Sequence, residues 1–125
     1  MNKLFISIVA IILLLVGCKQ EYRVSKELSM VDSLLKQGYV DSAYIRLHKI
    51  TSRNLHSVED SAYYALLYSQ AAYRTYKPIN SERLNFCINY YSKKSDEQEK
   101  LAMAYYYKGK VLYDAGNIKD GVVYV

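Results

Sequence analysis

The side chains best suited to chemistry in this chain of 125 residues are two thiols and two imidazoles. Cys18 directly follows an apolar run, and Cys87 lies within a helical apolar pattern. His48 and His56 stand eight residues apart, and no cysteine or carboxylate accompanies them at ligand spacing. A bound metal would need three or four such ligands in one place. The sequence therefore predicts no metal site.

Catalysis and nucleic-acid binding are not expected from the remaining residues. The glycines form no phosphate-binding loop, and no serine has the setting of a nucleophile elbow. Asp96, Glu97 and Glu99 precede an expected helix, where negative charge favours the helix dipole. The formal charge of +5 is scattered, with Lys93-Lys94 as the densest basic run. We therefore predict a protein that is not an enzyme, needs no cofactor and binds no nucleic acid.

The chain begins with the features of an export signal. Lys3 precedes an apolar segment at residues 4–16 that only Ser7 interrupts, and the small residue Gly17 follows it. A helix of this segment would measure roughly 20 Å, which is short of the roughly 30 Å hydrocarbon layer of a membrane. The pattern therefore indicates a signal peptide.

Four residues at the end of this segment, Leu15-Val16-Gly17-Cys18, resemble the lipobox of bacterial lipoprotein precursors. The resemblance implies that residues 1–17 form a lipoprotein signal peptide, cut before Cys18. It further implies that Cys18 carries the lipid, palmitate included, and that residues 18–23 are a lipidated tether. We expect the protein to lie in the bacterial cell envelope, attached to a membrane through the lipid on Cys18. Lys19 resembles the residue found there in lipoproteins of the outer membrane, which we favour.

A lipid on Cys18 would leave Cys87 without a partner for an intramolecular disulfide. Cys87 shares its apolar pattern with Leu84, Ile88 and Tyr91. We therefore interpret Cys87 as a small buried core residue.

Residues 24–125 show an internal repeat with a period of 39 residues. The shift brings apolar positions and expected breaks into register. Leu28 aligns with Leu67 and Tyr106, Leu34 with Tyr73 and Leu112, Ile45 with Leu84 and Val123, and Leu47 with Phe86 and Val125; the breaks are Gly38, Lys77-Pro78 and Gly116. Such periods are typical of stacked repeats.

Within each repeat the apolar spacing predicts two helices joined by a turn. We expect helices over residues 24–35, 43–50, 62–76, 84–91 and 101–115, and the third repeat would continue beyond Gly116. Predicted N-caps are Asp41 or Ser42, Ser57, Ser81 and Ser95. No strand is expected.

This pattern resembles tetratricopeptide repeats. Leu34, Gly38, Ala43 and Leu47 match in the first repeat, and Gly109, Leu112 and Gly116 match in the third. The resemblance implies an all-α fold. Residues 24–125 would form a tetratricopeptide-like solenoid of about three hairpins, and the small residues Ala43 and Gly109 would allow the helices to cross closely. The last hairpin is incomplete, so we expect a longer protein. HEAT-like or plain helical-hairpin arrays remain alternatives.

The sequence thus predicts a lipid-anchored helical-repeat scaffold that binds proteins or peptides. One alternative is the sensing front of a longer membrane-bound regulator. A second alternative is an outer-membrane lipoprotein that binds a solute or glycan. In each of these cases, the 15 tyrosines would either pack between repeats or line a binding surface.

Overall fold

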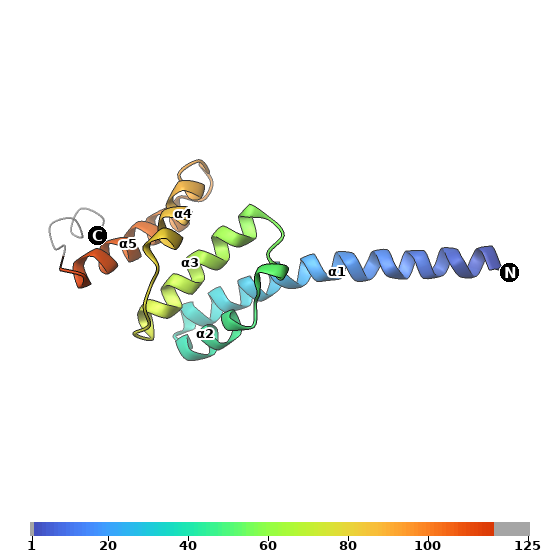
Figure 1. Cartoon of the computed structure of the whole chain (residues 1–125), viewed down its shortest axis with the longest axis horizontal. Helices are drawn as coiled ribbons and strands as arrows, with labels where there is room; N and C mark the ends of the chain where they lie inside the picture. The colour runs from blue at the N-terminus through green and yellow to red at the C-terminus, as the bar shows by residue number, and fades with distance from the viewer. Residues whose placement is uncertain (1, 117–125) are drawn as a thin grey trace.

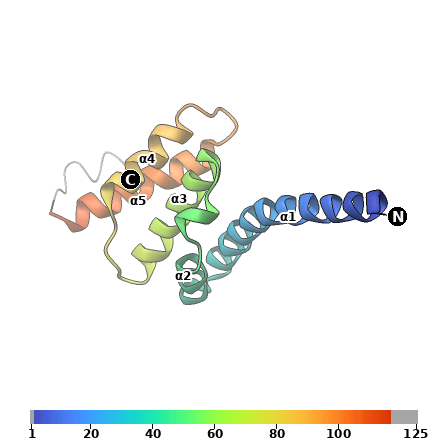
Figure 2. The same cartoon turned by 45° about the vertical axis from the view of Figure 1, so that its right-hand side comes forward.

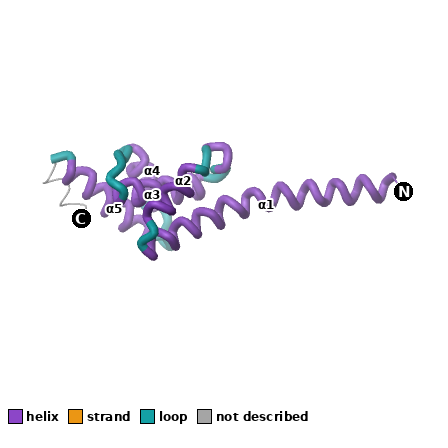
Figure 3. Tube along the Cα trace, turned by 90° about the horizontal axis from the view of Figure 1, so that it is seen from below, coloured by secondary structure: helices purple, strands orange, loops and turns teal. Residues whose placement is uncertain are grey.

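The computed structural model describes the backbone of residues 2–116 and, within that range, the side chains of residues 2–10 and 24–116. Its elements are α1 (Asn2–Gln37), α2 (Val40–His48), the short 3-10 helix η1 (Ser52–Asn54), α3 (Val58–Arg74), α4 (Ser81–Tyr91) and α5 (Gln98–Asp114). The described part contains no strand (Figure 3). The prediction of an all-α fold is confirmed. The second helix expected for the third repeat lies outside the described residues.

Helix α1 joins the N-terminal apolar segment to the first helix of the folded domain in one run of 36 residues. Its first half projects away from the other helices (Figure 1), and Leu4 and Phe5 are 72% and 70% exposed. Its second half carries the apolar stripe that the sequence predicts, with Leu28 and Val31 fully buried. Across the described range, no helix has both the length and the hydropathy that a membrane crossing requires.

Helix α3 lies at the centre of the domain and is buried on two faces. One face packs with α1 and α2 in a first core cluster that includes Leu67 and Ala71. The other face packs with α4 and α5 in a second cluster that includes Ala62 and Leu66. The small alanine side chains let neighbouring helices approach α3 closely from both sides.

The helices pack in chain order (Figure 2). Helices α1, α2 and α3 contact one another, and α3, α4 and α5 contact one another. Within the described range, neither α1 nor α2 contacts α4 or α5. Among the described helices, α3 alone therefore connects the two groups, and α1 and α5 stand apart on either side of it.

Three helices end at a residue with positive φ. Gly38 (φ 91°) follows α1 and Gly116 (φ 87°) follows α5, as the sequence predicts, because glycine adopts this conformation without a steric penalty. The equivalent residue after α3 is Tyr76 (φ 60°), and the predicted break at Lys77-Pro78 lies just beyond it, in the link between α3 and α4. The Lys77 N–H donates to the Ala72 carbonyl at 2.8 Å, which closes the helix before the proline is reached.

Of the N-cap predictions for α3 and α4, the first is confirmed and the second is wrong. The Ser57 hydroxyl accepts from the Asp60 N–H at 3.0 Å, which confirms Ser57 as the N-cap of α3. For α4 the predicted Ser81 is wrong by one residue, because Asn80 accepts from the Glu82 N–H at 2.9 Å. Asn80 has an extended backbone, which aims its side chain at the first free N–H groups.

Two further cap predictions are wrong. Helix α2 begins at Val40, before either Asp41 or Ser42, because the short turn at Gly38 leads directly into the helix. Helix α5 begins at Gln98, so Ser95 precedes its N-cap position by two residues. Neither N-cap residue, Tyr39 or Glu97, makes a side-chain cap hydrogen bond.

The shift of 39 residues aligns buried positions in the first helix of the repeat but not in the second. It pairs Leu28 with Leu67, and both are fully buried. It also pairs the fully buried Leu47 with Phe86, which is 40% exposed, so the prediction is wrong for the second helices. The link between α3 and α4 is longer than the link between α1 and α2, which displaces α4 along the chain. Its buried residues Leu84, Cys87 and Tyr91 repeat the spacing of Val40, Ala43 and Leu47.

Candidate functional site

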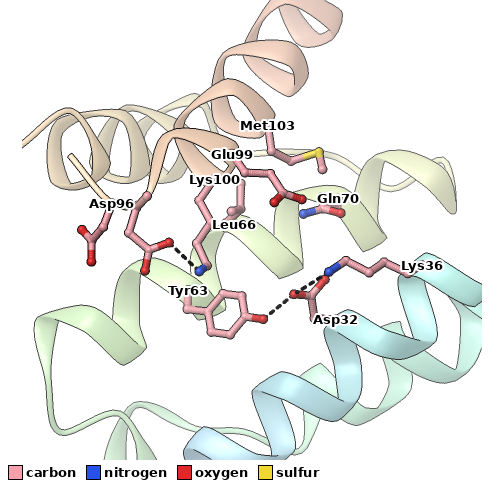
Figure 4. Close-up of a pocket in the computed structure, with 10 residues that line it drawn as sticks. Asp32, Lys36, Tyr63, Leu66, Gln70, Asp96, Glu99, Lys100 and Met103 are labelled. Carbon is pink, nitrogen blue, oxygen red and sulfur yellow. Dashed lines mark hydrogen bonds and ion pairs between the residues drawn. The ribbon is translucent and has the colours of Figure 1, made fainter. Parts of the chain in front are cut away.

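A groove crosses the domain where α1 and α5 flank α3. Helix α3 forms its floor, and α1 and α5 form its sides (Figure 4). The cavity within this groove has a volume of about 140 Å³. It exists because α1 and α5 both pack on α3 without touching each other.

The floor combines apolar and polar side chains. Tyr63, Leu66 and Gln70 follow one another at helical spacing on α3 and line the cavity. Asp32 and Lys36 of α1 border them on one side. The Tyr63 hydroxyl donates a hydrogen bond to the Asp32 carboxylate, and the Lys36 ammonium lies 3.8 Å from the same carboxylate. Asp32 therefore holds one wall of the groove to its floor.

The opposite side comes from α5 and the link before it. Lys100 pairs with Glu97 at 2.7 Å, and its ammonium also lies 5.1 Å from the centre of the Tyr63 ring. Met103 adds a flexible apolar contact to this side. Asp96 and Glu99 line the cavity too, and neither carboxylate has a bonded partner within the described part of the chain. Four carboxylates and two ammonium groups thus give the groove a net negative charge, although the chain as a whole is basic.

Gln70 is the unusual residue of the floor. Its side chain is only 7% exposed, yet its amide forms no hydrogen bond with any described residue. Every fully buried side-chain nitrogen or oxygen in the described part has a partner, so the Gln70 amide must reach the open space of the cavity. Figure 4 shows it pointing into that space. A buried amide is ordinarily hydrogen-bonded, and this one is left available to a guest.

Tyr63 acts in this groove as a hydrogen-bond donor at all ordinary pH values. Burial raises the pKa of its hydroxyl most, and the hydrogen bond to Asp32 and the negative charge of that carboxylate raise it further. All three causes oppose the formation of a second negative charge beside Asp32. The Tyr63 hydroxyl therefore stays protonated under physiological conditions and can donate to Asp32.

The size of the cavity limits what it can hold. Pockets for small-molecule ligands usually measure about 300–1,000 Å³, whereas about 140 Å³ is close to the volume that holds a benzene-sized group. One amino-acid side chain fits this space. The described residues also contain no group of three or more candidate metal ligands.

No family model, curated protein or solved structure matches this chain. The candidate site therefore rests on the geometry of the groove itself. The most reactive side-chain type near the core, the thiol of Cys87, is fully buried, and burial raises its pKa to about 12. Such a thiol is protonated at neutral pH and is a poor nucleophile.

The residues predicted to support repeat packing lie in the core or at its turns, and none lines the groove. Ala43 is fully buried in α2, Leu34 is half-buried against the first core cluster, and Gly109 is buried in α5. Leu112 is half-buried, and Gly38 and Gly116 end helices. Cys18, the predicted lipid attachment site, lies in the helical part of α1 whose side chains are not described.

Sequence reasoning missed Tyr63, Asp32 and Gln70 as groove residues. The sequence pattern explains Asp96 and Glu99 as charges at a helix start, and the structure places both in the lining of the groove. The available signal was a polar residue, Gln70, at the position where the shift of 39 residues places Val31 in the first repeat and Gly109 in the third.

Several of the described tyrosines lie between helices. Tyr44 of α2 lies 5.8 Å from Tyr68 of α3, and Tyr64 lies 5.9 Å from Tyr68, measured between ring centres. The Arg83 guanidinium of α4 lies 4.2 Å above the Tyr68 ring. These rings therefore join α2, α3 and α4 on the side away from the groove, which agrees with the packing interpretation.

Proposed function

We propose that this protein is a lipid-anchored helical-repeat scaffold that binds a protein or peptide partner at the bacterial cell envelope. The membrane that we propose for it is the outer membrane. Stacked helical hairpins form the scaffold in a tetratricopeptide-like manner, and the groove over α3 holds the partner. The lipid on Cys18 keeps the domain at a membrane. The mechanism is binding without covalent chemistry.

The observation that carries this proposal is the groove between α1 and α5. Each helix packs only on its near neighbours, which is how repeat proteins build extended binding surfaces. A volume of about 140 Å³ suits a side chain of a peptide better than a whole solute or glycan. For this cavity, the small size favours a peptide side chain over a whole nutrient molecule.

The anchor is supported by the sequence at the junction of signal and domain. Leu15-Val16-Gly17-Cys18 resembles a lipobox, and the first core residue described after it is Val24, which is 8% exposed. Cleavage before Cys18 would therefore leave the first core helix intact and place the lipid close to the domain. Two acyl chains are enough for stable attachment.

Position-specific photocrosslinking in intact cells tests the scaffold function. A photoreactive amino acid replaces Met103 or Lys36 in the groove, or Phe86 or Ile45 on exposed outer positions as matched controls. We expect one adduct of the same size from both groove positions and none from the outer positions. Equal adducts from both faces, or none from the groove, would argue against the proposed function.

A further inference from the structure

The groove has a charge opposite to that of the protein. The chain carries a formal charge of +5, but the cavity is lined by four carboxylates against two ammonium groups. Lys36 and Lys100 are each neutralised by a neighbouring carboxylate, Asp32 and Glu97 respectively. The negative charge that remains belongs to Asp96 and Glu99, which have no partner among the residues described. A cation is the complementary guest.

The Gln70 amide is a second and independent sign of a guest. Residue Gln70 is 93% buried, and its amide lacks a hydrogen bond within the described structure and points into the same cavity as Glu99 (Figure 4). Its carbonyl oxygen can accept one N–H while the carboxylate of Glu99 accepts others. A planar cation with several N–H donors satisfies both groups, and a point charge satisfies them less completely.

The rest of the lining suits an aliphatic stem. Leu66 and Met103 provide apolar contacts beside the polar groups, and the cavity admits one side chain rather than a larger ligand. Arginine combines an apolar stem with a guanidinium that binds carboxylates in a bidentate manner. The partner class follows from these three properties together.

We propose that the groove binds the side chain of an arginine presented by the partner peptide, with its guanidinium against Glu99 and Gln70 and its stem against Leu66 and Met103. This inference rests on the proposed scaffold function, because it names the chemistry of the partner that the groove would hold. Lysine is a weaker ligand at the same place, since its ammonium lacks the planar fork of donors.

The test is a titration followed by NMR of isotope-labelled methionine methyl groups in the full chain in detergent micelles. Met103 lines the cavity and reports on binding, while Met30, exposed on α1 outside the cavity, is an internal control. The probe is N-acetyl-arginine amide, and its neutral isostere N-acetyl-citrulline amide is the matched control. We expect a saturable shift of Met103 with the arginine probe in the millimolar range, little response to citrulline, and an unchanged Met30.

Two variants locate the binding. Glu99→Gln removes one charge-assisted contact and should weaken binding of the arginine probe by about fivefold to tenfold. Glu82→Gln makes the same change on α4, outside the cavity, and should leave the affinity unchanged. Equal responses to arginine and citrulline, no effect of Glu99→Gln, or stronger binding of an N-acetyl-glutamate amide would overturn the assignment.

The two proposals fail separately. A groove-specific crosslinked adduct without an arginine response at Met103 would leave the scaffold standing and reject arginine as the ligand. An arginine response that depends on Glu99, without any groove-specific adduct, would keep the side-chain site and reject the scaffold function.

Discussion

The guanidinium of Arg74 donates a hydrogen bond of 2.9 Å to the backbone carbonyl of Leu35. Arg74 is the last residue of α3, and Leu35 lies in the last turn of α1, so the contact ties the ends of two neighbouring helices together. The carbonyls of a final helical turn lack partners within the helix, and positive charge is favourable there. This side chain therefore adds a polar contact to the apolar packing of α3 against α1.

We expect Arg74→Ala to lower the free energy of unfolding by about 1 kcal/mol, since the hydrogen bond is charged but partly exposed to water. Chemical denaturation followed by circular dichroism measures the change. Arg53→Ala is the matched control, because Arg53 lies in η1 and forms no bond with any described residue. Equal effects of the two substitutions would show that the contact with Leu35 contributes nothing.

Replacing Tyr76 with glycine should stabilise the protein. Tyr76 has a φ of 60°, and its side chain is 96% exposed, so it bears the steric cost of this conformation without packing in return. That cost is about 1–2 kcal/mol for a residue with a Cβ, and the greater freedom of unfolded glycine offsets part of it. We expect Tyr76→Gly to raise the free energy of unfolding by ~0.5–1 kcal/mol.

Thermal or chemical denaturation measures the stability of Tyr76→Gly and of the control Tyr39→Gly. The control makes the same replacement at an exposed residue with a φ of −82°. Tyr39→Gly should destabilise the protein, because no strain is relieved there. A loss of stability in both variants would contradict the strain at Tyr76.

The buried thiol of Cys87 predicts a stability loss in alkaline solution. Burial raises its pKa from 9.0 to about 12, and Sγ donates to the Ala62 carbonyl at 3.5 Å. Above pH 9 the unfolded thiol loses its proton while the folded thiol keeps it until about pH 12. The contribution of the thiol to the free energy of unfolding is therefore fully present below pH 9. Between pH 9 and about pH 12 it falls by up to ~1.4 kcal/mol per pH unit.

Denaturation curves at a series of pH values test this dependence in the natural chain and in Cys87→Ala. We expect the stability difference between the two proteins to narrow as the pH rises from 9 to 12, with Cys87→Ala showing the shallower decline. Parallel declines would mean that the thiol does not titrate as its burial implies.

Lipid attachment at Cys18 is tested by metabolic labelling with a palmitate analogue. We expect Cys18→Ala to abolish the label and to shift the protein from the membrane fraction to the soluble fraction, because no acyl chain then holds it. Cys87→Ala is the matched control and should retain both the label and the membrane association. Full labelling of Cys18→Ala would refute the lipid-anchor hypothesis.

The helical pattern of this protein was readable from its sequence because a helix repeats its buried face over a few neighbouring residues. Leu28, Val31 and Leu35 fall on one stripe by spacing alone, and all three are buried. Gly38 and Ser57 likewise marked helix ends through the chemistry of a single residue. The resemblance of Leu15-Val16-Gly17-Cys18 to a lipobox is local in the same sense, so the prediction at Cys18 depends on these four residues alone.

The candidate site was decided by the tertiary structure. Asp32, Gln70 and Glu99 lie far apart in the chain, and they share one cavity only because α1 and α5 flank α3 at a distance from each other. That placement depends on the lengths of the links and on how small the side chains between helices are, and neither property appears in the periodicity of one helix. The sequence determined which residues each helix buries, and the packing of α3 between two groups of helices determined which polar residues meet.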